Sequence, residues 1–283
     1  MRSPACCGKL KDAGIQALQL DLGSAEAGFP LSSADVRRQW REEAERHGLR
    51  LAAVAALSVM EDGMTAEPGS GRRARAEEAI AAAVDCAAHM GIPQILLPSF
   101  RASAIRTRDD LRETARCLRL ACALAKHRGI AVATENLLDA GMTKTLFAIV
   151  GYDNLRTLLD LSHFTLGRRK NVFGDLSEQL AVCGGVHIRD GLYGEPGACP
   201  LGKGDAQVEK QLVALKRAGY GGPLFLENGY AARGFGDPLE ALGDDVAYLR
   251  RTASESLETV PPPVAKPSRP NGANALKTPP CNL

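Results

Sequence analysis

Short apolar runs alternate with longer amphipathic stretches along most of this sequence. The runs have the length and composition of buried parallel strands, and the stretches repeat their apolar residues with the period of a helix. This alternation predicts an α/β fold in which right-handed helical crossovers join parallel strands. Strands are predicted at Ile15–Leu22, Leu51–Leu57, Gln94–Leu97, Ile130–Glu135, Leu155–Leu161, Gly185–Arg189 and Leu224–Glu227. Helices are predicted at Ser33–His47, Arg73–Met90, Thr107–His127, Leu176–Cys183, Val208–Ala218 and Pro238–Arg251.

The C-terminal segment has a different composition. Residues 252–283 contain seven of the 16 prolines and no Phe, Trp or Tyr. Such a segment buries too little apolar surface to offset the entropy of ordering it, so we expect a disordered tail. The remaining residues, 1–251, match the ~250 residues typical of a (β/α)8 barrel, also called a TIM barrel. We therefore predict one barrel domain followed by a proline-rich tail.

Four successive predicted strands end in residues that can bind a metal ion. They are Glu135, Asp160, His187 and Glu227, separated by 25, 27 and 40 residues. In a barrel these strand ends share one rim, where the active sites of such barrels lie. Three carboxylates in a partly buried mouth repel one another unless a cation neutralises them.

A structural explanation exists for each of these residues alone. A single carboxylate at a strand end is commonly a solvated charge or a helix cap, and a single histidine is commonly a core or surface residue. The recurrence over four strands favours a site for one divalent metal ion. Carboxylate and imidazole ligands suit Mn²⁺, Mg²⁺ or Co²⁺ and leave Zn²⁺ possible, because no thiolate is among them.

Several segments of the chain are similar to a known family. The chain resembles the xylose isomerase-like TIM-barrel superfamily of sugar phosphate isomerases and epimerases from about Lys9 to Arg251. The resemblance implies that Glu135, Asp160, His187 and Glu227 bind one divalent metal ion, that both glutamates also act as the acid–base pair, and that His163 lies near the substrate. It is carried by Thr134-Glu-Asn136, Leu159-Asp-Leu-Ser-His163, Val186-His-Ile-Arg-Asp190, Pro200-Leu-Gly-Lys-Gly-Asp205 and Ala218–Asn228.

This resemblance predicts a metal-dependent isomerase or epimerase of carbohydrate metabolism that acts on a small sugar, ketose or polyol-derived ketone. One glutamate would remove a proton next to the carbonyl and the other would return one, while the metal stabilises the enediolate. Arg189 follows His187 by two residues, so strand alternation places both on one side. Together with Lys203, which lies between two glycines, Arg189 is a candidate substrate-binding residue.

Two alternatives use the same site. An enolate next to a carbonyl can expel water, so a dehydratase (lyase) of a keto acid or inosose is one alternative. The other is a non-catalytic metal-binding accessory protein. It is suggested by the strand count, since seven strands are predicted where eight are expected and the first helical stretch begins almost at Met1. A missing or truncated first strand leaves an unpaired sheet edge, which favours a homodimer.

Other functions are disfavoured by charge and composition. The formal net charge of +2 gives no general attraction to nucleic acid. A trinuclear zinc nuclease of the endonuclease IV type needs more histidines than the five present here. No apolar run reaches the ~18 residues of a membrane helix, and no secretory signal is visible, so we expect no membrane partner and a cytoplasmic protein with reduced cysteines.

Overall fold

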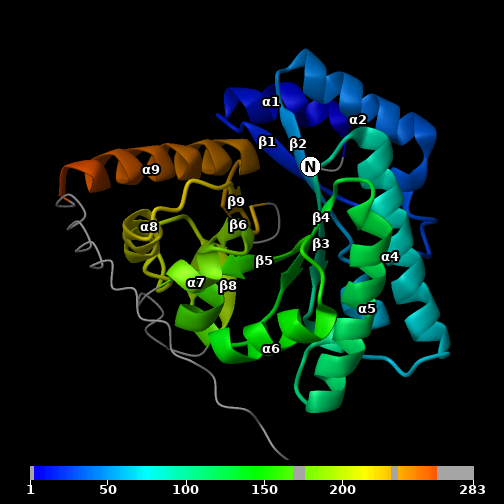
Figure 1. Cartoon of the computed structure of the whole chain (residues 1–283). Helices are drawn as coiled ribbons and strands as arrows, with labels where there is room; N and C mark the ends of the chain where they lie inside the picture. Colours follow the sequence, from blue (N-terminus) through cyan, green and yellow to red (C-terminus); the bar gives the residue numbers. More distant parts are fainter. Residues whose placement is uncertain (1–2, 168–175, 231–234, 260–283) are drawn as a thin grey trace, which may run out of the picture.

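The predicted parallel barrel is present. A computed structural model describes residues 3–167, 176–230 and 235–259. Seven parallel strands form one curved sheet, and their order in the sheet is their order in the chain (Figure 1). They are β1 (Ala17–Asp21), β2 (Arg50–Ala55), β3 (Gln94–Pro98), β4 (Ala131–Glu135), β5 (Leu155–Asp160), β6 (Cys183–Ile188) and β9 (Leu224–Leu226).

Helices follow the strands and cover the outside of the sheet. For example, α4 and α5 pack against each other and against β3 and β4 (Figure 1). The Thr107 side chain begins α5 with a reciprocal capping box to Asp110. The α-helices are α1 (Cys7–Asp12), α2 (Ala34–Arg46), α3 (Val59–Asp62), α4 (Gly71–Met90), α5 (Arg108–Lys126), α6 (Ala140–Val150), α7 (Ser177–Leu180), α8 (Val208–Arg217) and α9 (Pro238–Thr259).

Strand alternation separates two apolar layers. Outward-facing side chains such as Val132 and Val186 pack with the surrounding helices. A smaller inner cluster contains Ala55, Leu96, Ala133 and Leu158, with Phe225 packed against it. Residues two positions further along a strand point to the same side of the sheet. The carboxylates two positions after Ala133, Leu158 and Phe225 therefore also point inward. They are Glu135, Asp160 and Glu227.

Two local predictions differ from the structure. The predicted helix Leu176–Cys183 is wrong in its length, because α7 ends at Leu180 and Cys183 begins β6. The carbonyl of Val182 accepts a hydrogen bond from the Thr157 N–H of β5, which draws this segment into the sheet. The last helix extends beyond Arg251 to Thr259, into the segment predicted as the disordered tail, since no glycine or proline lies between Arg251 and Pro261.

Two further elements were not predicted. Helix α6 begins at an N-cap, Asp139, whose side chain accepts a hydrogen bond from the Met142 N–H. A two-stranded antiparallel hairpin, β7 (Asp190–Leu192) and β8 (Glu195–Cys199), follows β6 directly. The final residues of the chain, 260–283, lie outside the described residues.

The barrel is open between its first and last strands. Among the described residues, β1 pairs only with β2 and β9 pairs only with β6. A cleft of about 1750 Å³ separates the two edges and is lined by residues of both, by Gly221–Pro223 and by α9. The prediction of seven barrel strands is confirmed for the part of the chain that the structure describes, where the hairpin adds two further strands outside the barrel sheet. In that part, no helix is long and apolar enough to cross a membrane.

Gly191 provides a test of the hairpin packing. A Cβ atom at this position would collide with the carbonyl oxygen of Glu195 and lie 3.0 Å from the Cα of Pro196, both backbone atoms that a rotamer change cannot move. We expect Gly191→Ala to lower the free energy of unfolding by about 1–3 kcal/mol. Gly221→Ala is the matched control, because its Cβ would meet no atom within 4 Å. Urea denaturation of the two variants should separate them, and equal stabilities would contradict this packing.

Candidate metal and acid–base site

The predicted rim residues meet at one end of the barrel. Glu135 ends β4, Asp160 ends β5, His187 lies in β6, and Glu227 follows β9. Asp160 and His187 are direct partners in the strand register, and the backbone N–H of Glu227 donates to Ile188 O in β6. Glu135, Asp160 and His187 are each at most 3% exposed. The sheet geometry thus holds all four at the same depth.

His187 lies between the two glutamates. Its Nδ1 atom is 3.3 Å from Glu135 Oε1 and 3.4 Å from Glu227 Oε2. Below it, the ring meets Phe225 edge-on at a centroid distance of 6.0 Å, which limits its rotation. The Glu227 side chain is 41% exposed and forms the open side of the site. Solvent therefore reaches the cluster at Glu227 in the described part of the chain.

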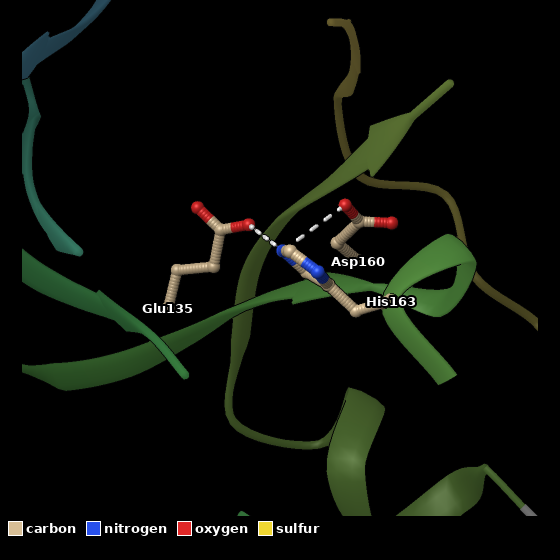
Figure 2. A group of neighbouring side chains, drawn as sticks. All are labelled: Glu135, Asp160 and His163. Carbon is tan, nitrogen blue, oxygen red and sulfur yellow. Dashed lines mark ion pairs between the residues drawn. The ribbon is translucent and has the colours of Figure 1, made fainter. Parts of the chain in front are cut away.

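His163 faces the other pair of carboxylates. Figure 2 shows its ring between Glu135 and Asp160, with Nε2 3.5 Å from an oxygen of each. His163 begins a π-helical turn, His163–Gly167, that follows β5. The Phe100 ring packs against the imidazole with ring centroids 4.7 Å apart. His163 therefore lies in the same cluster as the candidate metal ligands, and its place near the substrate stays a prediction.

Arg189 extends into the cluster from the end of β6. Its Nη2 atom is 2.5 Å from Asp160 Oδ2 and 2.7 Å from His163 Nε2, and its Nη1 atom is 3.1 Å from Glu227 Oε2. The prediction that Arg189 shares a side with His187 agrees with this geometry. Its role in binding substrate stays a prediction.

Burial and contacts within the cluster shift the pKa values of Glu135 and His187 in opposite directions. Burial acts to raise the pKa of Glu135, but the His163 and His187 imidazoles outweigh it and lower this pKa to about 2. Burial acts to lower the pKa of His187, but the Glu135 carboxylate and the charges of Glu227 and Asp160 raise it to about 9. The pKa of Glu227 is raised, chiefly by burial of its carboxylate among protein atoms. A pair of glutamates with different proton affinities suits acid–base chemistry.

The donor set fits a divalent cation. Two compact groups of possible ligands share Glu135, one with Asp160 and His163 and the other with His187 and Glu227. Asp160 Oδ2 and His187 Nδ1 are buried and face the cluster, where their neighbours are ion-pair partners, although neither atom makes a well-aligned hydrogen bond. Oxygen and imidazole donors of this kind bind Mn²⁺, Mg²⁺ or Zn²⁺.

Asp190 organises the loop beside the site. Its fully buried carboxylate accepts hydrogen bonds from four backbone N–H groups at 2.8–3.1 Å. The donors are Gly191, Gly202, Gly204 and Ala206. This explains the Gly-Lys-Gly-Asp sequence, because a Cβ on Gly204 would collide with Asp190 and Gly191. Lys203 lies on this loop and is exposed, and no described contact joins its side chain to the cluster. Its proposed role in substrate binding is therefore not supported by a direct contact.

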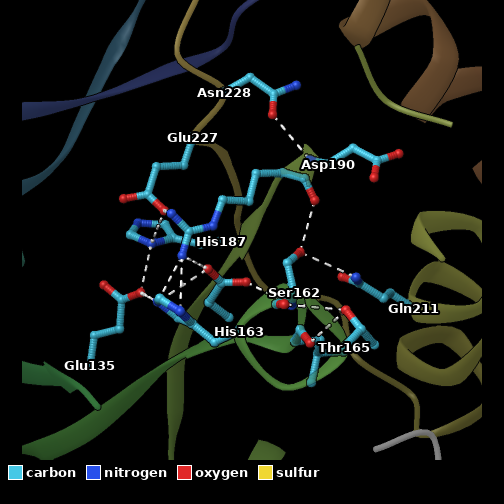
Figure 3. Close-up of polar contacts among 12 residues, drawn as sticks. Glu135, Ser162, His163, Thr165, His187, Asp190, Gln211, Glu227 and Asn228 are labelled. Atoms are coloured by element: carbon cyan, nitrogen blue, oxygen red, sulfur yellow. Dashed lines mark hydrogen bonds and ion pairs between the residues drawn. The ribbon is translucent and has the colours of Figure 1, made fainter. Parts of the chain in front are cut away.

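A polar network behind the rim was missed at the sequence level. Asn228 Oδ1 accepts a hydrogen bond from the Asp190 N–H (Figure 3). The Asn228 amide donates to Asp245 of α9 at 2.7 Å. Ser162 donates its N–H to Asp160 Oδ1 and its hydroxyl to Arg189 O. Ser162 and Asn228 occur within the motifs quoted above, but their spacing in the sequence does not predict these hydrogen bonds. They orient Asp160 and the strand ends that carry Arg189 and Glu227.

Comparisons with known proteins agree with this fold. Residues 7–252 match the family described as xylose isomerase-like TIM barrel. A curated relative from Actinoplanes sp., named 2-epi-5-epi-valiolone 7-phosphate 2-epimerase, is 32% identical over 254 residues, which cover 87% of this chain and 88% of the relative. The chain belongs to the xylose isomerase-like TIM-barrel family. The sequence-based prediction of a sugar isomerase or epimerase is confirmed at the level of the enzyme class.

Solved structures show the same fold at low sequence identity. A structure of L-ribulose 3-epimerase is 18% identical with a TM-score of 0.71, and the match covers 91% of this chain and 92% of that one. A xylose isomerase-like TIM-barrel protein from Mycobacterium smegmatis, solved in complex with magnesium, is 15% identical with a TM-score of 0.63, over 90% and 89% of the two chains. These likenesses support the barrel assignment despite the open seam.

The raised pKa of His187 predicts a pH-dependent stability of the metal-free protein. A pKa raised from 6.5 to about 9 stabilises the fold fully below pH 6.5, and this contribution is lost as the pH rises through 9. The contribution is at most about 3 kcal/mol. Urea denaturation in the presence of a chelator should show wild-type stability falling relative to His187→Gln between pH 6.5 and 9. A constant difference between the two proteins over this range would contradict the assignment.

Proposed function

We propose that this chain is a divalent-metal-dependent epimerase or isomerase of a small ketose or polyol-derived ketone. Glu135 and Glu227 are proposed as the proton-transfer pair. Glu135, Asp160, His187 and Glu227 are proposed to hold the metal, with Mn²⁺, Mg²⁺ or Co²⁺ as the leading candidates and Zn²⁺ as a further possibility.

The observation that carries this proposal is the placement of the two glutamates. They come from β4 and β9, with β5 and β6 between them in the sheet, and they approach the same His187 nitrogen at 3.3 and 3.4 Å. A ketone seated over His187 would have one carboxylate toward each face. Epimerisation needs this arrangement, because a proton leaves one face of the carbon next to the carbonyl and another is added to the opposite face.

The chain's own residues account for most of the reaction. One glutamate accepts the C–H proton and the other delivers a proton to the opposite face of the same carbon, or to the neighbouring oxygen or carbon in an isomerisation. His163 and Arg189 lie close enough to the cluster to hold substrate oxygens. A bound divalent cation would supply Lewis-acid stabilisation of the negative charge that develops on the carbonyl oxygen.

The curated relative indicates where a substrate search should begin. Its name specifies a ketone that carries a phosphate and is epimerised at carbon 2. We therefore propose phosphorylated ketones of this kind as the first substrates to test, followed by unphosphorylated ketoses and inososes. Arg189 and Lys203 are the proposed contacts for an anionic group, because guanidinium and ammonium groups are the usual partners of phosphate.

Proton exchange at carbon tests the proposed acid–base pair. Proton NMR in deuterated buffer with Mg²⁺ should show deuterium entering the carbon next to the carbonyl of the correct substrate. Glu135→Gln and Glu227→Gln should each lower turnover by about 10²–10⁴-fold, because each removes one proton-transfer group. Glu42→Gln is the matched control, since Glu42 is 59% exposed on α2 and pairs with Arg38. It should keep wild-type turnover.

The product distinguishes the reaction classes. Epimerisation and isomerisation conserve the substrate mass, whereas a product lighter by one water would identify a dehydratase. Full exchange activity in both Glu→Gln variants would contradict the proposed pair. Ligand and metal binding without exchange over the whole substrate panel would favour a non-catalytic accessory protein.

Metal binding is tested without any substrate. Isothermal titration of the chelator-treated protein with Mn²⁺ should give one site per chain. Asp160→Asn should weaken binding by about 10- to 100-fold or more, because it removes a carboxylate charge from the ligand set. Asp153→Asn is the control, since Asp153 is 78% exposed and pairs with Lys126. Absence of binding to the wild-type protein would rule out the metal-dependent mechanism.

A further inference from the structure

The guanidinium of Arg189 joins two carboxylates that belong to different ligand groups. Asp160 is grouped with Glu135 and His163, whereas Glu227 is grouped with Glu135 and His187. Arg189 contacts Asp160 Oδ2 at 2.5 Å through Nη2 and Glu227 Oε2 at 3.1 Å through Nη1. It therefore links the two halves of the ligand set at the point where a shared cation would contact both carboxylates.

The Arg189 side chain is enclosed rather than solvated. It is 12% exposed, and its Nε atom is buried without a hydrogen-bond partner. Its backbone is fixed, because the Ser162 hydroxyl donates to Arg189 O at 2.8 Å. Burying a guanidinium in this way is favourable only where carboxylates compensate for its lost hydration. The ion pairs to Asp160 and Glu227 provide that compensation.

The charges of the cluster lead to the same conclusion. Glu135 and Asp160 are each 3% exposed, and Glu227 adds a third carboxyl group. Apart from Arg189, the charged or titratable side chains that meet these carboxylates in the described structure are His163 and His187. Arg189 is the member of this set that is cationic at every physiological pH. If both Arg189 and a metal ion were absent, Asp160 would have no partner that is positively charged at every physiological pH.

We propose that Arg189 is the counter-ion of the Asp160 and Glu227 carboxylates in the metal-free protein, and that it releases both carboxylates when a divalent metal ion binds. This rests on the metal site of the proposed function. A cation held by Asp160 and Glu227 would compete with Arg189, because both would neutralise the same two carboxylates. Arg189 keeps the ligands together before loading and competes with the ion. His163 Nε2 lies 2.7 Å from Arg189 Nη2, so the Arg189 side chain still has a polar neighbour after it releases the carboxylates.

Two variants of Arg189 test this competition. Arg189→Met keeps much of the side-chain volume and removes the charge, whereas Arg189→Lys keeps the charge but cannot bridge two carboxylates with a planar fork. We expect Arg189→Met to bind Mn²⁺ about tenfold more tightly than wild type in isothermal titration. Arg189→Lys should fall between the two proteins. The matched control is Arg128→Met, which removes a guanidinium that is 44% exposed and pairs with Asp85.

Thermal unfolding of the metal-free proteins provides a readout that is independent of metal binding. Arg189→Met should unfold about 5 °C below wild type in chelator, since it leaves buried carboxylates without their counter-ion. Saturating Mn²⁺ should raise its Tm by more than it raises that of wild type. Arg128→Met should behave as wild type in both measurements. Arg189→Lys controls for a general folding defect. Because it keeps the positive charge, it should retain part of the stability of the metal-free protein.

The outcomes separate this proposal from the proposed function. Binding of Mn²⁺ by Arg189→Met that is equal to or weaker than wild type would overturn the competition, even if wild type binds the ion as proposed. If no protein binds Mn²⁺ or Mg²⁺, the metal-dependent function fails, and the metal-free Tm still decides whether Arg189 is the counter-ion. An unchanged metal-free Tm in Arg189→Met would overturn that role.

Discussion

Mutual repulsion of three carboxylates at one end of the barrel governs the architecture of this protein. Glu135, Asp160 and Glu227 are brought together by parallel strands whose inner faces carry small or apolar residues, and they need positive charge to remain there. His187 lies between the glutamates, and the Arg189 guanidinium bridges Asp160 and Glu227. Raised and lowered pKa values in this cluster are consequences of the same enforced proximity.

A second polar system holds the first in place. The Asp190 carboxylate accepts hydrogen bonds from four backbone N–H groups of the hairpin and the following loop. Asn228 connects Asp190 to Asp245 of α9. Each member is buried and has its partner, so the network favours one arrangement over alternatives. It fixes the position of the chain on both sides of Glu227. Glu227 follows β9, which is an edge strand of the open seam, so this network connects that edge of the barrel to β6 and α9.

Particular elements show where sequence reasoning succeeds and where it does not. The strands that carry Glu135, Asp160 and His187 were predictable, because each is an apolar run that ends in a charged or titratable residue. The turn Ser177–Leu180 was predicted as a longer helix, since an apolar periodicity does not reveal that Val182 bonds to the neighbouring strand. The hairpin after β6 was missed because its strands are short and contain glycine. Their pairing depends on Asp190, which bonds over distances in the chain that periodicity does not encode.

By itself, the sequence determined the parallel barrel, its seven described strands and the candidate ligands, because strand period and strand-end chemistry are local properties. Only the tertiary structure decided how those ligands interact. The spacing of His187 and Arg189 placed them on one side of a strand, but the bridge from Arg189 to Asp160 and Glu227 requires three strands to be packed together. The open edge beside β9 and the enclosure of Asp190 likewise depend on contacts between segments far apart in the chain. Such contacts arise when distant charges are forced into one buried volume, where each must find a partner.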